Sequence, residues 1–421
     1  MTDFDALDFF TDESLLTDPV PYFEHLRGQC PVQPTGHHGV VAVTGYDEAA
    51  EVYRDNENFS AINTVFGPFT PFPAPFAGDD ITGMLEESRS QLLSSDILAT
   101  MDPPRHTRER ALLMRLMTPK RLRENEDFMW RLADERLDDA LSGGRCEFVG
   151  DFARPYTLLV IADLLGVPRE QHQVFREGFQ QAAAGSSQTL VEQNALAWLY
   201  GYFAEYVEDR RRHPRDDVLT QLAEAKYPDG STPEVLAVVH VAVFLFAAGQ
   251  DTTARLLSSA LKYLAEYPEL QDTLRADRAR IPGFIEECLR MDSPIKSDFR
   301  ITKRTTALGG VTLPAGTPLA IFNGATNRDP GRFEHPHEFH PGRPNVREHI
   351  AFGRGIHSCP GAPLARSEGR VTVDRILLRT RDIRFAEEFH GPAGRRRFEY
   401  EPNWLISGLR ALHLEFTPVE R

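Results

Sequence analysis

The sequence predicts a mainly α-helical fold with small β-sheets, of the α+β class. Segments with the helical spacing of apolar residues are long and numerous, whereas the segments rich in β-formers are short and few. The 41% apolar fraction, with 30 glycines in addition, suffices for a sizeable core and excludes a disordered or collagen-like chain. No repeat or low-complexity linker divides the 421 residues, so we expect one domain over residues 1–421.

Spacing and local punctuation place each element. Asp102-Pro103-Pro104 offers a capping carboxylate before prolines that suit a first helical turn, and Ser142-Gly143-Gly144 ends the next helix. Helices are expected from that first turn to Leu116 and over Arg121–Leu141, Arg154–Leu165, Gln193–Arg212, Pro233–Tyr267, Gly283–Met291 and Pro363–Arg379. Strands are expected over Val40–Val43, Arg300–Arg304, Ala307–Leu313 and Pro318–Phe322, and a long loop over Phe66–Phe76.

Charge and cysteine usage narrow the function. Lys and Arg number 47 against 62 Asp and Glu, and the resulting net charge of −15 argues against nucleic acid and an anionic membrane surface as partners. The acidic N-terminus lacks the features of a signal peptide. The apolar segment Val235–Gly249 is too short to span a bilayer and contains His240, so we expect a core helix and no membrane anchor. Four cysteines without a C-x-x-C pair fit a reducing cytoplasm.

The decapeptide Phe352–Gly361, FGRGIHSCPG, combines glycines with a cysteine just before a predicted helix. Glycines let a backbone come close to a flat ligand. A thiolate at Cys359 would face the unpaired N–H groups of the helix, which stabilise a negative charge and suit metal ligation. One cysteine alone disfavours tetrahedral zinc, whereas haem iron accepts a single thiolate. The alternative is a buried structural cysteine in a turn.

Polar residues interrupt the long apolar helix at 247–253, AAGQDTT. Glycine in a helix interior costs about 1 kcal/mol relative to alanine, so Gly249 needs a reason. Thr252 can donate to the carbonyl one turn earlier and bend the helix, which opens a groove beside the small residues. Asp251 next to an alcohol offers a short proton path, as cleavage of the O–O bond of dioxygen requires. The alternative is a kink at a helix–helix contact.

The pattern F-x-x-G-x-H-x-C-x-G resembles the haem-binding signature of the cytochrome P-450 superfamily, the haem-thiolate monooxygenases, and A-G-x-D-T-T resembles its oxygen-activating helix. The resemblance implies the cytochrome P-450 fold around haem b, with Cys359 as the axial ligand. It implies proton delivery by Asp251 and Thr252, with Ala248 and Gly249 making room for dioxygen. The other haem-loop residues that it implies as cofactor contacts are Phe352, Gly353, His357 and Gly361.

The resemblance also assigns charged residues outside the haem loop. Glu287 and Arg290 match the E-x-x-R pair of the family, and Arg343 matches the arginine that completes a buried triad. We assign these three to folding and to the integrity of the haem pocket. The side chains implied for the haem propionates are His106, Arg110, Arg300 and His357.

By matched position, the substrate pocket is expected to draw on Phe66–Phe76 or the residues up to Leu98, and on Phe244, Ala247, Ala248, Ile295, Lys296, Leu405 and Ile406. Most of these residues are apolar, which favours a hydrophobic small molecule such as a terpenoid, a fatty or branched lipid, a steroid or an aromatic compound. Lys296 hints at an anionic group on the substrate, and the alternative is a solvated lysine.

Electrons are expected from a separate ferredoxin and ferredoxin reductase, because no flavin or ferredoxin domain is recognisable at this length. An acidic ferredoxin would suit the basic residues expected on the thiolate side of the haem: Arg105, Arg108, Arg115, Arg354, Arg366 and Arg370. Two other functions stay open, a peroxide-using relative and a haem-based gas sensor. Asp251 and Thr252 argue against the peroxide-using enzyme, which needs no proton relay for dioxygen.

Overall fold

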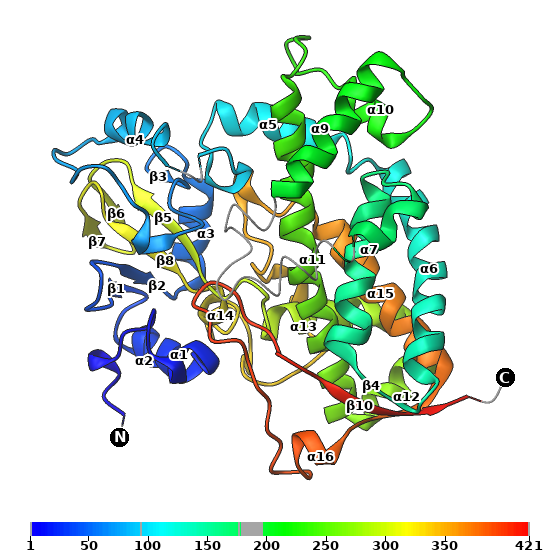
Figure 1. Ribbon diagram of the computed structural model, residues 1–421. Coiled ribbons are helices and arrows are strands. Elements are labelled where there is room, and N and C mark those ends of the chain that lie inside the picture. The colour runs from blue at the N-terminus through cyan, green and yellow to red at the C-terminus, as the bar shows by residue number, and fades with distance from the viewer. Residues whose placement is uncertain (1, 93–94, 176, 178–196, 420–421) are drawn as a thin grey trace. The chain divides into compact units, whose positions relative to one another are not determined.

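The computed structural model describes residues 2–92, 95–175, 177 and 197–419 (Figure 1). The chain forms two compact units, and each is built from three stretches that alternate along the sequence. Unit 1 comprises Met1–Arg105, Pro282–Cys359 and Glu399–Arg410, and unit 2 comprises His106–Ile281, Pro360–Phe398 and Ala411–Arg421. Neither unit is a continuous piece of the sequence, because the chain alternates between the two units.

A five-stranded sheet organises unit 1, in the order β1-β2-β8-β5-β3. The pair β2 and β8 is parallel, with Ala42 opposite Ala320, and the other pairs are antiparallel. A separate hairpin joins β6 to β7. The bounds of the strands are β1 Val32–Pro34, β2 Val41–Val43, β3 Phe59–Ser60, β5 Asp298–Thr302, β6 Thr306–Leu308, β7 Val311–Leu313 and β8 Pro318–Ile321.

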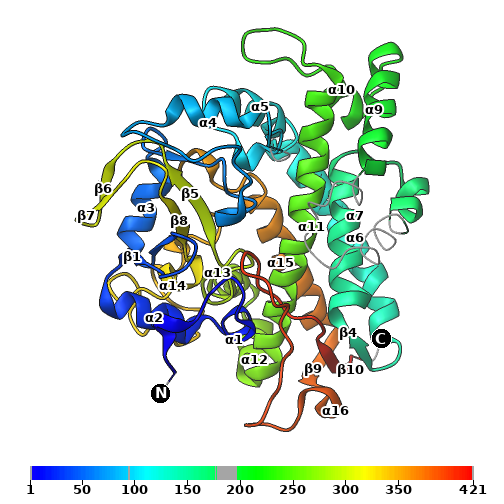
Figure 2. The same cartoon turned by 60° about the vertical axis from the view of Figure 1, so that its left-hand side comes forward.

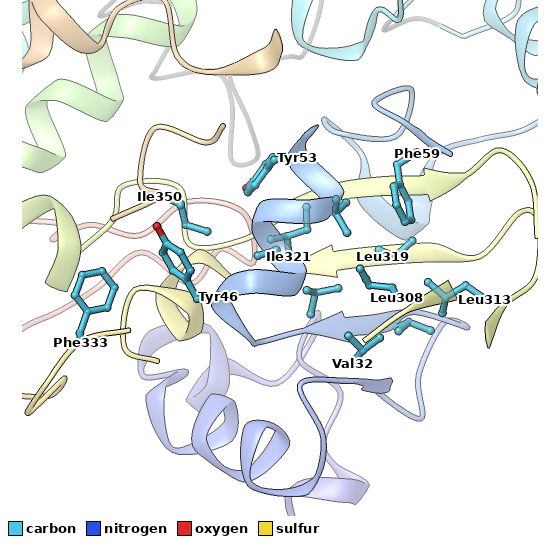
Figure 3. Close-up of a cluster of buried hydrophobic side chains, with 14 residues drawn as sticks. Val32, Tyr46, Tyr53, Phe59, Leu308, Leu313, Leu319, Ile321, Phe333 and Ile350 are labelled. Atoms are coloured by element: carbon cyan, nitrogen blue, oxygen red, sulfur yellow. The ribbon is translucent and has the colours of Figure 1, made fainter. Parts of the chain in front are cut away.

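Helices and apolar side chains cover this sheet. Tyr46 and Tyr53 of α3 (Tyr46–Arg54) pack with Phe59, Leu319 and other apolar side chains of the strands in one cluster, shown in Figure 3. A second cluster joins the N-terminal helices to the sheet through Phe9, Phe23 and Phe322. The other α-helices of this unit are α1 Glu13–Thr17, α2 Val20–Gln29, α4 Thr82–Arg89, α13 Ile281–Met291 and α14 Asn323–Thr326, of which α13 starts one residue before the unit boundary.

Unit 2 is helical apart from the small sheet β4-β10-β9. The long helix α11 (Val235–Glu266) packs against α7 (Arg154–Leu164), α9 (Ala197–Arg212) and α15 (Ala362–Arg379), as Figures 1 and 2 show. The remaining elements are α5 Arg105–Met114, α6 Pro119–Leu141, α10 Val218–Ala223, α12 Pro268–Ala276, α16 Glu387–His390, β4 Arg145–Glu147, β9 Thr380–Phe385 and β10 His413–Pro418. Within the described chain, α11 is the one helix long and apolar enough to cross a membrane by length and composition, and many of its residues are buried in the core.

The predicted helices are confirmed with ends shifted by a few residues, except that residues 193–196 of one lie outside the described residues. The expected strands are also present, and Ala307–Leu313 is the β6–β7 hairpin. The predicted capping role of Asp102 is wrong. Its carboxylate accepts hydrogen bonds from the Ala61 N–H at 3.0 Å and from Arg89 Nη2 at 2.5 Å, so it ties down an earlier part of unit 1.

Candidate active site

The cysteine loop of unit 1 is a tight turn that only glycine can follow at two points. Gly353 and Gly355 have φ of +61° and +68°, the left-handed region that favours glycine. A Cβ at Gly355 would lie 2.1 Å from the carbonyl oxygen of Tyr53, so that side of the loop runs directly against α3. The Cys359 N–H closes the turn by donating to the Phe352 carbonyl at 2.8 Å. The loop therefore fixes the backbone from which the thiol projects.

The Cys359 side chain is exposed, three residues before α15 begins. The alternative of a buried structural cysteine is therefore wrong. Within the described residues, no group of three or more His, Cys, Asp or Glu side chains is placed to hold a metal ion. A single accessible sulfur fits haem iron, which takes one protein thiolate, and does not fit a tetrahedral zinc site.

The three residues assigned to pocket integrity lie together in unit 1. Arg290 donates to both carboxylate oxygens of Glu287, each at 2.8 Å, and neither side chain is exposed. Arg343 Nε lies 3.5 Å from Glu287 Oε1, which also accepts the His340 N–H at 2.8 Å. The remaining Arg290 donors reach the carbonyls of Asn327, Pro336 and Glu338. Such bidentate, fully bonded geometry is what makes a buried charge pair tolerable.

A second buried pair was missed by the sequence analysis. His349 Nε2 lies 2.9 Å from Glu286 Oε2, with 1% and 3% of the two side chains exposed. His349 Nδ1 accepts the Ala351 N–H at 3.2 Å, so Nε2 carries the proton that goes to Glu286. The pair joins α13 to the chain that enters the cysteine loop. The sequence held a signal for this pair. Glu286 and Glu287 are adjacent in E-E-x-x-R, so Arg290 could not be the bidentate partner of both carboxylates.

Arg300 on β5 is buried and already has an acid beside it. Its Nη1 donates to Asp298 Oδ1 and Thr64 Oγ1, both at 3.0 Å, and its guanidinium lies over the Tyr53 ring. A buried arginine held in this way is rigid. Its contact with a propionate stays a prediction.

Four predicted pocket residues of unit 1 come from two short segments, residues 295–296 and 405–406. Ile295 pairs with Ile406 in a β-bridge, and the Lys296 N–H donates to the Leu405 carbonyl at 3.0 Å, so these four positions lie together. The interpretation of the Lys296 side chain is wrong in both forms, as a substrate contact and as a solvated charge. It is 3% exposed, and its Nζ donates to the Leu16 carbonyl. This ammonium therefore anchors the N-terminal helix α1.

Part of the loop expected over Phe66–Phe76 is packed against other residues of unit 1. Phe72 and Phe76 pack against a buried cluster of unit 1 that contains Ile62 and Leu85, and Phe69 lies against Phe10. Further along, the chain forms α4. Packing of these aromatic side chains leaves less of the segment available for a substrate than the sequence analysis assumed.

The polar segment of α11 in unit 2 presents one accessible face. Phe244, Ala247, Ala248, Asp251 and Thr252 follow the i, i+3, i+4, i+7, i+8 spacing of a single helix side, and none of them is fully buried. Thr252 Oγ1 donates to the Ala248 carbonyl at 2.9 Å, as predicted. Asp251 Oδ2 accepts from Arg255 Nε at 2.8 Å. The three predicted pocket residues of α11 and the acid–alcohol pair therefore share this face.

The alternative interpretation of Gly249, a helix–helix contact, is also met. A Cβ at Gly249 would lie 2.7 Å from Ile161 Cδ1 of α7. A side chain at Gly249 would require Ile161 to shift, so the glycine permits this close contact between α7 and α11. Its role in making room for dioxygen stays a prediction. Ala248, by contrast, is exposed on the face described above.

The remaining predicted contacts of unit 2 are on α5 and α15. His106 and Arg110 are four residues apart on α5, which places them on one side of that helix, and His106 is 1% exposed. Gly361 is the N-cap residue of α15. Their contacts with haem stay predictions.

Most arginines of the expected basic surface are engaged within their own unit. Arg108 lies 3.8 Å over the ring of Tyr227. Arg105 and Arg370 pair with Asp96 and Glu126, respectively. Arg115 and Arg354 donate to the carbonyls of Lys226 and Glu348. The carboxylates beside Arg105 and Arg370 offset the charge of these two side chains, so they attract an acidic partner less strongly than the sequence suggested.

An exposed thiol on a glycine turn and a helix face that joins small residues to an acid and an alcohol both fit the haem-thiolate class of oxygen-activating proteins. The family model described as Cytochrome P450 matches residues 184–381. The chain is 35% identical to Cytochrome P450 144 of Mycobacterium tuberculosis, over 91% of this chain and 87% of the relative. It is 30% identical to Cytochrome P450 monooxygenase PikC of Streptomyces venezuelae, over 96% and 92%.

A solved structure agrees with this relationship. Substrate-free cytochrome P450 CYP150A6 of Mycobacterium marinum is 53% identical, covers 99% of this chain and 100% of its own, and gives a TM-score of 0.95. The chain belongs to the cytochrome P450 family. It is a haem-thiolate monooxygenase with haem b as its cofactor.

Proposed function

We propose that this monooxygenase inserts one oxygen atom of dioxygen into a C–H bond of a mainly hydrophobic small molecule. The observation that carries the proposal is the accessible face of α11, where Phe244, Ala247 and Ala248 adjoin Asp251 and Thr252. An apolar surface beside a proton-carrying pair suits an apolar substrate next to the reacting oxygen. The other apolar residues proposed to contact the substrate are Ile295, Leu405 and Ile406. This mainly apolar set fits a terpenoid, a fatty or branched lipid, a steroid or an aromatic compound.

The residues that would hold the cofactor come from both units, which we propose act as one haem domain over residues 1–421. Cys359 is the axial ligand, and the side chains for the propionates are His106, Arg110, Arg300 and His357. Phe352, Gly353, Ala248 and Gly361 complete the contacts. The glycine turn and the accessible sulfur support this assignment. When bound, haem supplies the redox chemistry that activates dioxygen.

The chain itself handles protons. Thr252 holds a hydroxyl hydrogen that is donated to the Ala248 carbonyl, and a small rotation of this side chain would redirect it to a ligand on the open face of α11. Asp251 is the acid one residue earlier, and its bond to Arg255 keeps the carboxylate oriented. Proton delivery at this point favours complete use of electrons in oxygen insertion over release of hydrogen peroxide.

The two electrons are proposed to come from a separate ferredoxin and ferredoxin reductase, in the cytoplasm. Because Arg105 and Arg370 are paired with carboxylates, we expect only moderate dependence of docking on salt concentration.

The test combines a ligand screen with isotope labelling. Terpenoids, fatty acids, steroids and aromatic compounds are titrated into the ferric protein, and those that shift the spin state are incubated with NADPH, ferredoxin, reductase and ¹⁸O₂. One ¹⁸O atom in the product supports the proposal. Product formed only with added hydrogen peroxide would instead identify a peroxygenase. Ligand binding without turnover under either condition would favour a gas sensor.

A further inference from the structure

Helix α7 touches α11 at the residues that precede the acid–alcohol pair. The two helices lie side by side in unit 2, as both views show (Figures 1 and 2). Ile161 meets Gly249, as described above, and Thr157, one turn earlier on α7, meets the next residue of α11. The Thr157 hydroxyl donates to the Gln250 carbonyl at 2.9 Å, across 93 residues of sequence.

Thr157 is built into this contact. Its side chain is fully buried, and its hydroxyl has one other acceptor, the Arg154 carbonyl of its own helix at 3.2 Å. A hydroxyl has a single hydrogen, and the shorter distance favours Gln250. A threonine in mid-helix usually bonds back within its own helix, so donation to a neighbouring helix is a specific tie between α7 and α11.

The tie acts on the peptide unit that leads into Asp251. The Gln250 carbonyl and the Asp251 N–H belong to one planar peptide, so a bond to the carbonyl fixes the plane from which the Asp251 side chain departs. The next residue is Thr252, whose hydroxyl depends on the Ala248 carbonyl one turn back. A rotation of the Gln250–Asp251 peptide would therefore move both members of the pair.

We propose that Thr157 is a positioning residue for proton delivery: from α7 it holds the Gln250–Asp251 peptide in the orientation that Asp251 and Thr252 need. This inference rests on the proposed function, in which that pair carries protons to dioxygen. Ile161 supports the same contact by packing against Gly249, so the two α7 residues hold α11 by a hydrogen bond and by shape.

The test removes the hydroxyl while keeping the volume. Thr157→Val deletes the bond, and Thr157→Ser retains it. Thr380→Val is the matched control, because Thr380 is a buried threonine of the same unit whose hydroxyl donates to the Ile376 carbonyl of α15 at 2.7 Å and not to a carbonyl of α11. The ferrous carbonyl spectrum confirms haem loading of each holoenzyme. If Thr157→Val loads no haem, Thr157→Ala takes its place.

Two readouts are used. The first is amide hydrogen exchange of the holoenzyme over residues 247–256, which reports the tie itself and needs no turnover. The second is the fraction of NADPH electrons released as hydrogen peroxide, with testosterone as a hydrophobic probe and ferredoxin and reductase supplied. We expect Thr157→Val to raise the exchange of this segment and the peroxide fraction by roughly fivefold, the scale of one lost hydrogen bond. Thr157→Ser and Thr380→Val should remain near wild type.

The inference is overturned if Thr157→Val exchanges like wild type, or if its peroxide fraction is unchanged while exchange rises. It is also overturned if Thr157→Ser is as impaired as Thr157→Val, because packing rather than the hydroxyl would then matter, or if Thr380→Val shows the same effect. Failure of the proposed function is a separate result, since it would show as an absence of NADPH-dependent oxygen insertion by the wild-type enzyme.

Discussion

The His349 imidazole donates to the Glu286 carboxylate across 2.9 Å, and both side chains are buried. Replacement of Glu286 by leucine would leave the His349 N–H without its acceptor. An unsatisfied buried donor costs about 1–3 kcal/mol, so we expect Glu286→Leu to lower the free energy of unfolding by this amount in a urea titration. Glu57→Leu, at an exposed position of the same unit, is the control. Equal stability of both variants would contradict a structural role for the pair.

Loss of the Arg290–Glu287 pair should lower the free energy of unfolding more than loss of the His349–Glu286 pair. Arg290→Leu leaves a buried carboxylate without its bidentate partner, which costs roughly 3–5 kcal/mol. We expect this variant to lose most of its haem after purification, measured as the ratio of Soret to protein absorbance. Arg280→Leu breaks an exposed i, i+3 pair with Asp277 and should cost less than about 1 kcal/mol. A similar loss in both variants would mean that burial does not matter.

Glu368 on α15 makes stability depend on pH. Both of its carboxyl oxygens are buried and without a hydrogen-bond partner among the described residues, and burial raises the pKa of this acid well above its usual 4.5. The folded protein therefore binds a proton that the unfolded chain releases above pH 4.5. In this window stability falls as pH rises, by up to about 1.4 kcal/mol per pH unit, until the folded-state pKa is reached.

Glu368→Gln removes this proton linkage. We expect the melting temperature of the variant to exceed that of wild type at neutral pH, and the difference to shrink as the pH approaches 4.5. Differential scanning calorimetry across that range measures both trends. A variant less stable than wild type at pH 7 would show that the carboxylate is charged and has a partner in the folded protein.

Replacement of Lys296 should loosen the N-terminal segment and should not change the preference for charged over neutral ligands. Its Nζ donates to the Leu16 carbonyl, so Lys296→Met should free α1 and speed proteolytic cleavage within the first 20 residues. The affinities of fatty acids and of their neutral methyl esters should keep the same ratio as in wild type. If only the affinity for the anionic ligands falls, Lys296 faces the substrate after all.

Local signals were enough to predict much of this protein. The apolar period of α11 and the breakers around α6 are properties of short segments, and the glycine–cysteine turn lies within ten residues. The side chains of Lys296 and His349 bond to Leu16 and Glu286, which are 280 and 63 residues away in the sequence. The Thr157–Gln250 tie likewise spans two helices. No periodicity in one segment reveals which distant carbonyl or carboxylate will meet it, so these contacts required the structure.

Ligation of haem iron by Cys359 is tested most directly by the ferrous carbonyl spectrum. Each of the four cysteines is replaced by alanine in turn, and the purified protein is reduced with dithionite under carbon monoxide. We predict the strongly red-shifted Soret band of a thiolate-ligated haem in wild type, Cys30→Ala, Cys146→Ala and Cys288→Ala, and its loss in Cys359→Ala alone. A red-shifted band that persists in Cys359→Ala, or a histidine-type spectrum in wild type, would contradict the assignment.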